Sequence, residues 1–146
     1  MSSEQLSKIS NTIKFLSADM IQSANSGHPG TPMGLSDVMS VFMSKVRHNP
    51  KNPAWLNRDR VVFSGGHASA LVYSYLYLSG YDLSMDDLKS FRRLHSKTPG
   101  HPEITTPGVE IATGPLGQGV ANAVGFAMAA KYAAHLLNEG DNEIID

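Results

Sequence analysis

The sequence predicts an α/β domain in which a parallel β-sheet is flanked by helices. Two short apolar segments, at 60–63 and 109–112, are each followed by a glycine-rich turn and then by a helical apolar pattern. Strands that alternate with helices in this way are typical of a parallel sheet. In open sheets of this kind, ligands bind beyond the carboxyl ends of the strands, which is where both glycine turns are expected. The two turns are therefore candidate parts of a binding site.

The composition is that of a globular protein with one hydrophobic core. Of the 146 residues, 41% are hydrophobic and 17% are charged, and the net charge is -1. A chain this close to neutrality has no bulk attraction for nucleic acid or anionic membranes. The absence of cysteine excludes disulfides and thiolate metal sites, and no segment approaches the ~18 consecutive apolar residues of a membrane span. We expect a soluble, cytoplasmic protein that binds neither nucleic acid nor membrane.

Two helices are predicted ahead of the first strand. The first begins at Ser2 or Ser3 and stops near Gly27, because its apolar residues recur at steps of three and four. These residues are Leu6, Ile9, Ile13, Leu16 and Met20. A loop at 26–34 precedes the second helix, which the prolines and asparagines of HNPKNP at 48–53 bring to an end. Its apolar face would carry Leu35, Val38, Met39, Phe42 and Val46.

The remaining helices follow the two strands. Strand 60–63 leads into the turn SGGH and a third helix that begins at Ala68. Ser84 can cap a short fourth helix. Strand 109–112 leads into TGPLGQG and a long fifth helix over 120–137. Because independent stability usually needs at least three strands, the sheet is expected to be incomplete in this chain.

Three of the six histidines, His28, His67 and His101, lie in glycine-rich loops. Glycine and proline keep these histidines on irregular backbone, and loops of that kind tend to carry function. A neutral imidazole offers one hydrogen-bond donor and one acceptor, so three converging imidazoles would suit a polyhydroxyl or phosphate ligand. Solvated or capping roles are expected for His48, His95 and His135.

The TGPLGQG loop places Gly114, Gly117 and Gly119 between a strand and a helix. Bare backbone amides and a helix N-terminus in such a loop can approach an anion or a flat polar ring. The loop lacks the ending of a phosphate-binding P-loop and the spacing of the dinucleotide-binding G-x-G-x-x-G motif. A tight turn with close helix packing is an equally good interpretation of these glycines.

Metal binding and nucleophilic catalysis have little support in the spacing of the residues. No H-x-x-x-H or H-E-x-x-H pattern is present, so we expect no metal ligands among the histidines. No G-x-S-x-G motif occurs either, although Ser64 and Ser69 flank His67 and leave a serine nucleophile formally open. Hydrogen bonding and proton transfer by the loop histidines are the better supported chemistry.

Four stretches of the chain together resemble the successive N-terminal motifs of transketolases. They are SGHPGTPMG at 26–34, NRDRVVFSGGHA at 57–68, LHSKTPGHPE at 94–103 and TGPLGQGVANAVGFAMA at 113–129. Their order, spacing and intervening helices agree over almost the whole chain. Four motifs in register are far more specific than any one glycine loop.

The resemblance implies a thiamine-diphosphate-binding fold and a transferase of aldehyde or ketone groups. Transketolases use thiamine diphosphate and Mg²⁺ or Ca²⁺ to move a two-carbon ketol unit from a ketose phosphate to an aldose phosphate, in the pentose phosphate pathway. They act as homodimers, and the cofactor performs the covalent chemistry while the protein binds, orients and moves protons. Two alternative interpretations are a related dihydroxyacetone synthase and a noncatalytic binding module derived from the fold.

The same resemblance implies roles for individual residues. His28 and His101 would be catalytic and substrate-binding, with His28 facing the donor and acceptor sugars and His101 bonded to the C1 hydroxyl of the donor. His67 would bind the cofactor diphosphate. The residues that would line the thiamine are Gly114, Pro115 and Leu116.

The sequence departs from the family pattern in two respects. Transketolases often have Asn where Gly65 stands, so a side-chain contact there is absent or is supplied by backbone. The sequence also stops at DNEIID, before the Gly-Asp-Gly motif that ligates the cation in this family, so no metal ligand is named in these residues. We expect residues 1–146 to be the N-terminal portion of the thiamine-diphosphate-binding domain of a longer chain, and to be inactive alone; one subunit of a split enzyme is the alternative.

Overall fold

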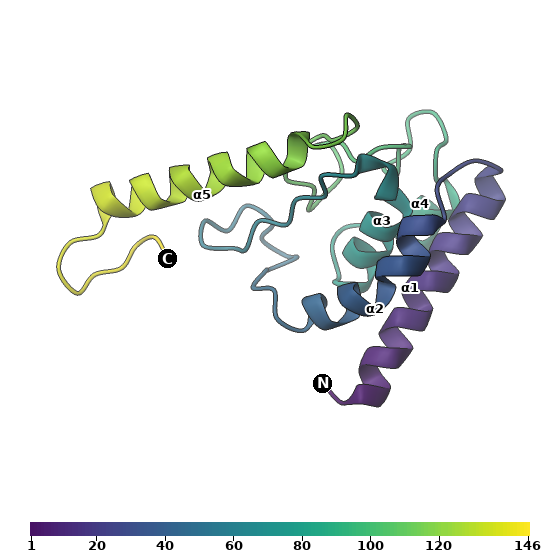
Figure 1. The fold of residues 1–146 in the computed structure, drawn as a ribbon, viewed down its shortest axis with the longest axis horizontal. Helices are drawn as coiled ribbons and strands as arrows, with labels where there is room; N and C mark the ends of the chain where they lie inside the picture. Colours follow the sequence, from purple (N-terminus) through teal and green to yellow (C-terminus); the bar gives the residue numbers. More distant parts are fainter.

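The computed structural model describes residues 1–146 as six helical elements joined by loops (Figure 1). Four of them, together with the one-turn 3-10 helix η1, form a packed group, and α5 extends away from that group (Figure 1). The elements are α1 (Ser3–Ala24), α2 (Gly30–Met43), η1 (Gly66–Ala68), α3 (Ser69–Leu78), α4 (Met85–Lys89) and α5 (Gln118–Leu137). None of these helices is long and apolar enough to cross a membrane.

Helix α1 agrees with its sequence prediction at both ends. Ser2 caps it by accepting a hydrogen bond from the backbone amide of Gln5 at 3.2 Å, and the Gln5 side chain accepts one from the Ser2 amide at 2.8 Å. Asn25, with φ of 49°, ends the helix in the left-handed conformation. Its predicted apolar face turns inward, with Ile13 and Met20 buried.

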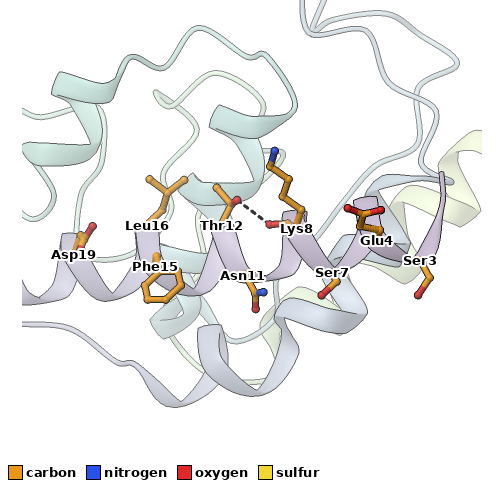
Figure 2. Close-up of a pocket in the computed structure, with 9 residues that line it drawn as sticks. All are labelled: Ser3, Glu4, Ser7, Lys8, Asn11, Thr12, Phe15, Leu16 and Asp19. Atoms are coloured by element: carbon orange, nitrogen blue, oxygen red, sulfur yellow. Dashed lines mark hydrogen bonds between the residues drawn. The ribbon is translucent and has the colours of Figure 1, made fainter.

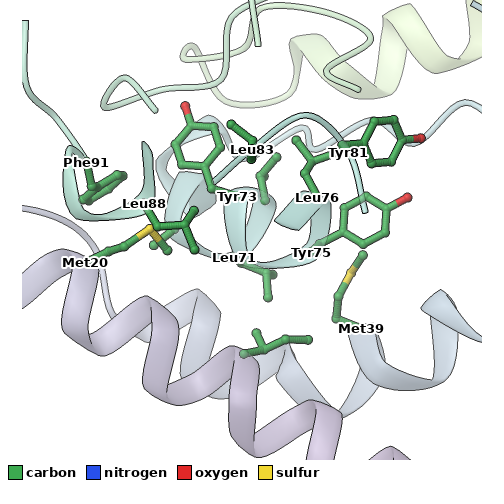
Figure 3. Close-up of a cluster of buried hydrophobic side chains, with 13 residues drawn as sticks. Met20, Met39, Leu71, Tyr73, Tyr75, Leu76, Tyr81, Leu83, Leu88 and Phe91 are labelled. Carbon is green, nitrogen blue, oxygen red and sulfur yellow. The ribbon is translucent and has the colours of Figure 1, made fainter. Parts of the chain in front are cut away.

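The hydrophobic core surrounds α3, whose residues are almost all apolar or small (Figure 3). Every residue of α3 from Ser69 to Leu76 is buried, so this helix is enclosed on all sides by α1, α2 and the loops. Tyr73 lies in the core with its ring against that of Phe91, at 6.0 Å between ring centroids. A helix that is apolar all round needs such enclosure. The core therefore fixes the position of η1, which leads directly into α3.

Helix α2 differs from its prediction in the residue at which it begins and in the face that it buries. It begins at Gly30, inside the stretch predicted as a loop, and ends at Met43. It buries Ser36 and Met39, whereas the predicted apolar face is largely exposed. Ser36 packs against Ser10 of α1, with 3.2 Å between the two hydroxyl oxygens. Small side chains let α1 and α2 approach closely, and that contact turns Leu35, Val38 and Phe42 outward.

The two predicted strands do not form in this structure, so residues 1–146 do not show the expected parallel sheet. Segments 60–63 and 109–112 line one small internal gap, but no backbone hydrogen bond joins them. An ion pair connects the two regions: the Arg58 guanidinium donates two hydrogen bonds to the Glu110 carboxylate, with nitrogen–oxygen distances of 2.7 and 2.9 Å. A strand exists only where a second strand lies within about 4.8 Å to share its backbone groups. Neither segment has such a partner here, and the one β-bridge joins Glu139 and Asn142.

Helix α5 is held mainly at its ends. Gly117, with φ of 93°, precedes its first turn, and the C-terminal residues fold back beside its last turn. Asn57 donates to the backbone oxygen of Ile144 at 2.9 Å, which ties this tail to the loop before 60–63. The predicted helix over 120–137 is confirmed. Its apolar side chains are nevertheless mostly exposed, including Val120, Val124, Met128, Tyr132 and Leu136.

Candidate functional site

The structure brings the three loop histidines together. The ring centroids of His28 and His67 are 5.4 Å apart, and those of His28 and His101 are 6.5 Å apart. The three come from the α1–α2 loop, from η1 and from the loop after α4. Residues that are distant in sequence thus form one cluster at the surface, where His28 and His101 are exposed.

The His28 loop is shaped by the end of α1. Gly27 has a φ of 149°, and a Cβ there would lie 2.7 Å from Cγ1 of Ile21, so the position requires glycine. Pro29 follows His28 and occupies the N-cap of α2. The histidine is therefore held between a chain reversal and a helix start, with little backbone freedom.

His67 lies where the SGGH turn touches the TGPLGQG loop. A Cβ on Gly66 would lie 2.2 Å from the backbone oxygen of Thr113, so the two backbones are in direct contact. The Nε2 atom of His67 is 3.3 Å from the hydroxyl of Thr31 in α2, within hydrogen-bond distance. The two glycine turns therefore pack against each other, which places His67 beside the loop that begins at Thr113.

Three hydrogen bonds anchor the loop that carries His101. Tyr73 donates its hydroxyl to the backbone oxygen of Pro99 at 2.7 Å, and Ser69 donates to that of Gly100 at 2.8 Å. Because both donors come from the buried helix α3, the backbone next to His101 is rigidly placed. The backbone amide of Thr113 also donates to Pro102 at 3.3 Å, which joins this loop to TGPLGQG.

Of the three residues predicted to line the thiamine, the structure brings one close to the histidines. A Cβ on Gly114 would lie 3.9 Å from Cδ2 of His101. Pro115 and Leu116 are exposed on the same loop, and Leu116 has 73% of its surface accessible.

Sequence reasoning missed Arg92, which contacts two of the histidine loops. Its guanidinium donates to the hydroxyl of Ser26 at 3.0 Å and lies 3.4 Å from Nδ1 of His28. The same group is 3.5 Å from the backbone oxygen of Gly100. No sequence pattern distinguishes Arg92 from its neighbour Arg93, because all of its partners are brought to it by the fold.

Arg92 brings a positive charge to the cluster, next to His28. Although His28 is exposed, partial desolvation by the neighbouring loops lowers its pKa below the usual value, and Arg92, His67 and His101 lower it further. None of the groups that act on His28 is a carboxylate. His28 is therefore neutral near neutral pH, and the surroundings favour an anionic or hydroxyl-rich ligand.

The other three histidines take no part in the cluster. His95 is exposed, and His135 lies in the last turn of α5, as predicted. His48 departs from prediction because it is partly buried and stacks on Tyr81, with 5.6 Å between ring centroids. Burial lowers the pKa of His48, since a charged imidazole is disfavoured next to an apolar ring.

Two other kinds of site are not supported by the geometry. No group of three histidine, aspartate or glutamate side chains is arranged to hold a metal ion. A hollow of about 760 Å³ runs along the exposed face of α1 (Figure 2). Its lining comes from α1 alone, with Thr12 bonded to the backbone oxygen of Lys8, so no chemical groups converge there from other elements.

The comparison with protein families decides what kind of domain holds this cluster. The model of the family described as transketolase, thiamine diphosphate binding domain, matches residues 5–146. The chain belongs to this transketolase family. The histidines, the SGGH turn and the TGPLGQG loop all lie within the matched residues.

Individual transketolases are closely similar to the chain. Transketolase 1 of Pasteurella multocida is 58% identical over 141 residues, which is 95% of this chain and 21% of that protein. The crystal structure of a transketolase from Campylobacter jejuni is 73% identical, with a TM-score of 0.92 over 94% of this chain and 22% of that one. A Pichia stipitis transketolase in complex with sedoheptulose-7-phosphate is 53% identical, with a TM-score of 0.94 over 99% of this chain and 21% of its own. The chain thus spans about a fifth of the length of the transketolases it matches.

Proposed function

We propose that this chain forms part of a transketolase that moves a two-carbon ketol unit from a ketose phosphate to an aldose phosphate. The convergence of His28, His67 and His101 beside Arg92, with no carboxylate among the groups that act on His28, is the observation that carries the proposal. Such a set of groups suits a ligand that is rich in phosphate and hydroxyl oxygens. The Pichia stipitis relative was solved with a ketose phosphate, which supports this class of substrate.

The residues present also fit thiamine diphosphate. Gly114 leaves bare backbone next to His101, where a Cβ would meet only Cδ2 of that ring at 3.9 Å, so a flat ring can approach the chain there without meeting a side chain. When bound, thiamine diphosphate supplies the nucleophilic carbon of the reaction. In our proposal His67 donates a hydrogen bond to the diphosphate, and Gly114, Pro115 and Leu116 lie along the thiamine.

His28 and His101 act on the sugar in this proposal. His101 binds the C1 hydroxyl of the donor, and His28 binds donor and acceptor hydroxyls and relays protons. A neutral imidazole can both donate and accept, so the lowered pKa of His28 suits this role. Rigid loops are an advantage here, because small misplacement of such groups is costly to the rate.

The remaining features of the proposal concern the complete sheet, the cation, the assembly and the cellular setting. Strands from the rest of the chain would pair with segments 60–63 and 109–112 and complete a parallel sheet, and they would also bring the Mg²⁺ or Ca²⁺ ligands. The exposed apolar side chains of α5 support association into a homodimer. A cytoplasmic enzyme of the pentose phosphate pathway is the setting that we propose.

Replacing His67 tests the cofactor role. In the full-length enzyme, His67→Ala should weaken thiamine diphosphate binding by roughly 1 to 3 kcal/mol, because a hydrogen bond to a charged group is lost. Calorimetric titration with cofactor in the presence of Mg²⁺ measures this change. His135→Ala, which alters a histidine on α5 far from the cluster in sequence, should leave the dissociation constant unchanged. An unaltered constant in His67→Ala would remove His67 from the cofactor site.

Residues 1–146 alone should show neither transketolase activity nor thiamine diphosphate affinity tighter than about 1 mM. His28 and His101 are exposed, so water competes for each hydrogen bond, and about 1 kcal/mol per bond does not offset the cost of immobilising the cofactor. Titration of the purified chain with cofactor and Mg²⁺ checks the prediction. Saturation at micromolar cofactor would show that these residues form the binding site without further chain.

A further inference from the structure

We propose that Arg92 is a positioning residue that holds His28 in its neutral Nε2-protonated tautomer and ties the His28 loop to the His101 loop. The catalytic role of Arg92 rests on the proposed function, whereas the acylation experiment described below does not depend on it. Arg92 lies in the loop that follows α4, and its side chain reaches Ser26 just beyond the end of α1. None of the sequence motifs includes it.

The contacts of the guanidinium connect the two loops. One terminal nitrogen donates to the hydroxyl of Ser26 at 3.0 Å. The other lies 3.4 Å from Nδ1 of His28 and 3.5 Å from the backbone oxygen of Gly100, the residue before His101. One rigid, planar group thus contacts the loops of both histidines that we place at the sugar.

The chemistry of arginine determines the protonation of His28. A guanidinium has five N–H donors, no acceptor, and keeps its charge in proteins. At 3.4 Å from Arg92, Nδ1 of His28 must present its lone pair, so the proton of the neutral ring lies on Nε2. The Nε2–H donor is then available to a ligand, and no rearrangement of protons is needed before it binds.

Arg92 is itself firmly placed. Its backbone amide donates to the backbone oxygen of Thr98 at 2.9 Å, and its φ of 60° is uncommon for a residue other than glycine. The guanidinium carbon lies 5.7 Å from the centroid of the Phe91 ring. A Cβ on Gly100 would come within 3.3 Å of that carbon, so glycine makes room for the side chain. A left-handed backbone conformation at a residue other than glycine, maintained by the surrounding structure, is common at functional sites.

The charged and titratable groups that face His28 are Arg92, His67 and His101. Partial desolvation of the exposed His28 ring is the first cause of its lowered pKa, and the charge of Arg92 is the next. Removal of Arg92 therefore raises the pKa of His28 toward its ordinary value. The neutral form predominates above this pKa, so the variant keeps His28 protonated up to a higher pH than the parent does.

The first measurement is independent of catalysis. Diethyl pyrocarbonate acylates the neutral imidazole, and peptide-resolved mass spectrometry of the full-length protein gives the pH midpoint for His28. In Arg92→Gln this midpoint should move to higher pH, and in Arg92→Lys, which keeps the charge but not the planar fork, it should move less. Arg93→Gln is the matched control, because the Arg93 side chain is exposed and is not among the groups that act on His28, and its midpoint should equal that of the parent. Equal midpoints in Arg92→Gln and the parent would overturn the inference.

The second measurement connects Arg92 to catalysis. With a ketose phosphate donor, Arg92→Gln should lower kcat/KM by roughly 10- to 100-fold and move its acid limb to higher pH, while thiamine diphosphate affinity stays unchanged. Loss of cofactor affinity without a change in the pH profile would show a merely structural role and overturn the inference. An inactive parent enzyme would instead refute the proposed function, and the acylation midpoint would still decide the role of Arg92.

Discussion

Gly66→Ala is expected to abolish thiamine diphosphate binding and to destabilise the full-length protein by more than the usual 1 to 3 kcal/mol of an overpacked site. The added Cβ would lie 2.2 Å from the backbone oxygen of Thr113 and 2.5 Å from its carbonyl carbon. Backbone atoms cannot rotate away as a flexible side chain can, so the SGGH turn and the TGPLGQG loop must separate. His67, the next residue, would move with the turn.

Thermal unfolding and calorimetric titration with cofactor measure the two effects. Gly125→Ala provides the matched control, because a Cβ at that position in α5 meets nothing within 4 Å. Alanine is also the better helix former, so the control should be as stable as the parent or slightly more stable. A Gly66→Ala protein with the melting temperature and dissociation constant of the parent would show that the two loops do not need this contact.

Alanine at His28 or His101 should lower kcat/KM by roughly 10²- to 10⁴-fold in the full-length enzyme, the range for losing a group that moves protons in the reaction. Both histidines are exposed and approach the cluster from loops that the core holds in place. Neither side chain supports the core, so folding and cofactor binding should persist. The expected pattern is thus the reverse of that for His67→Ala, which acts on cofactor affinity.

Steady-state kinetics with a ketose phosphate donor and an aldose phosphate acceptor provide the measurement, with cofactor affinity determined in parallel. His95→Ala is a suitable control, since His95 is exposed and outside the cluster. Near-normal kcat/KM in both His28→Ala and His101→Ala would remove these residues from the reaction. A loss confined to the aldose phosphate step would assign the affected histidine to acceptor binding alone.

Features that depend on neighbours in the chain could be predicted from the sequence. Helix α1 follows from the spacing of its apolar residues and from Ser2 and Asn25 at its ends, all of which act within a few residues. The short helix α4 follows equally from Ser84, whose hydroxyl accepts from the Asp87 amide at 3.1 Å. The motif resemblance likewise indicated the family, because four motifs in register carry more information than any single one. The three loop histidines were identified in advance, since glycine and proline mark irregular backbone wherever they occur.

Features that depend on distant partners were decided by the tertiary structure. The inward face of α2 is set by the close contact of Ser36 with Ser10, which an apolar pattern does not reveal. Segments 60–63 and 109–112 have the composition of strands, yet composition supplies no partner for their backbone groups, and none pairs with them here. Arg92 reaches Ser26 across 66 positions of the chain, so its place beside His28 could not be read from either segment alone. Local preferences determine helices and turns, whereas the convergence of a site requires the packing that brings separate segments together.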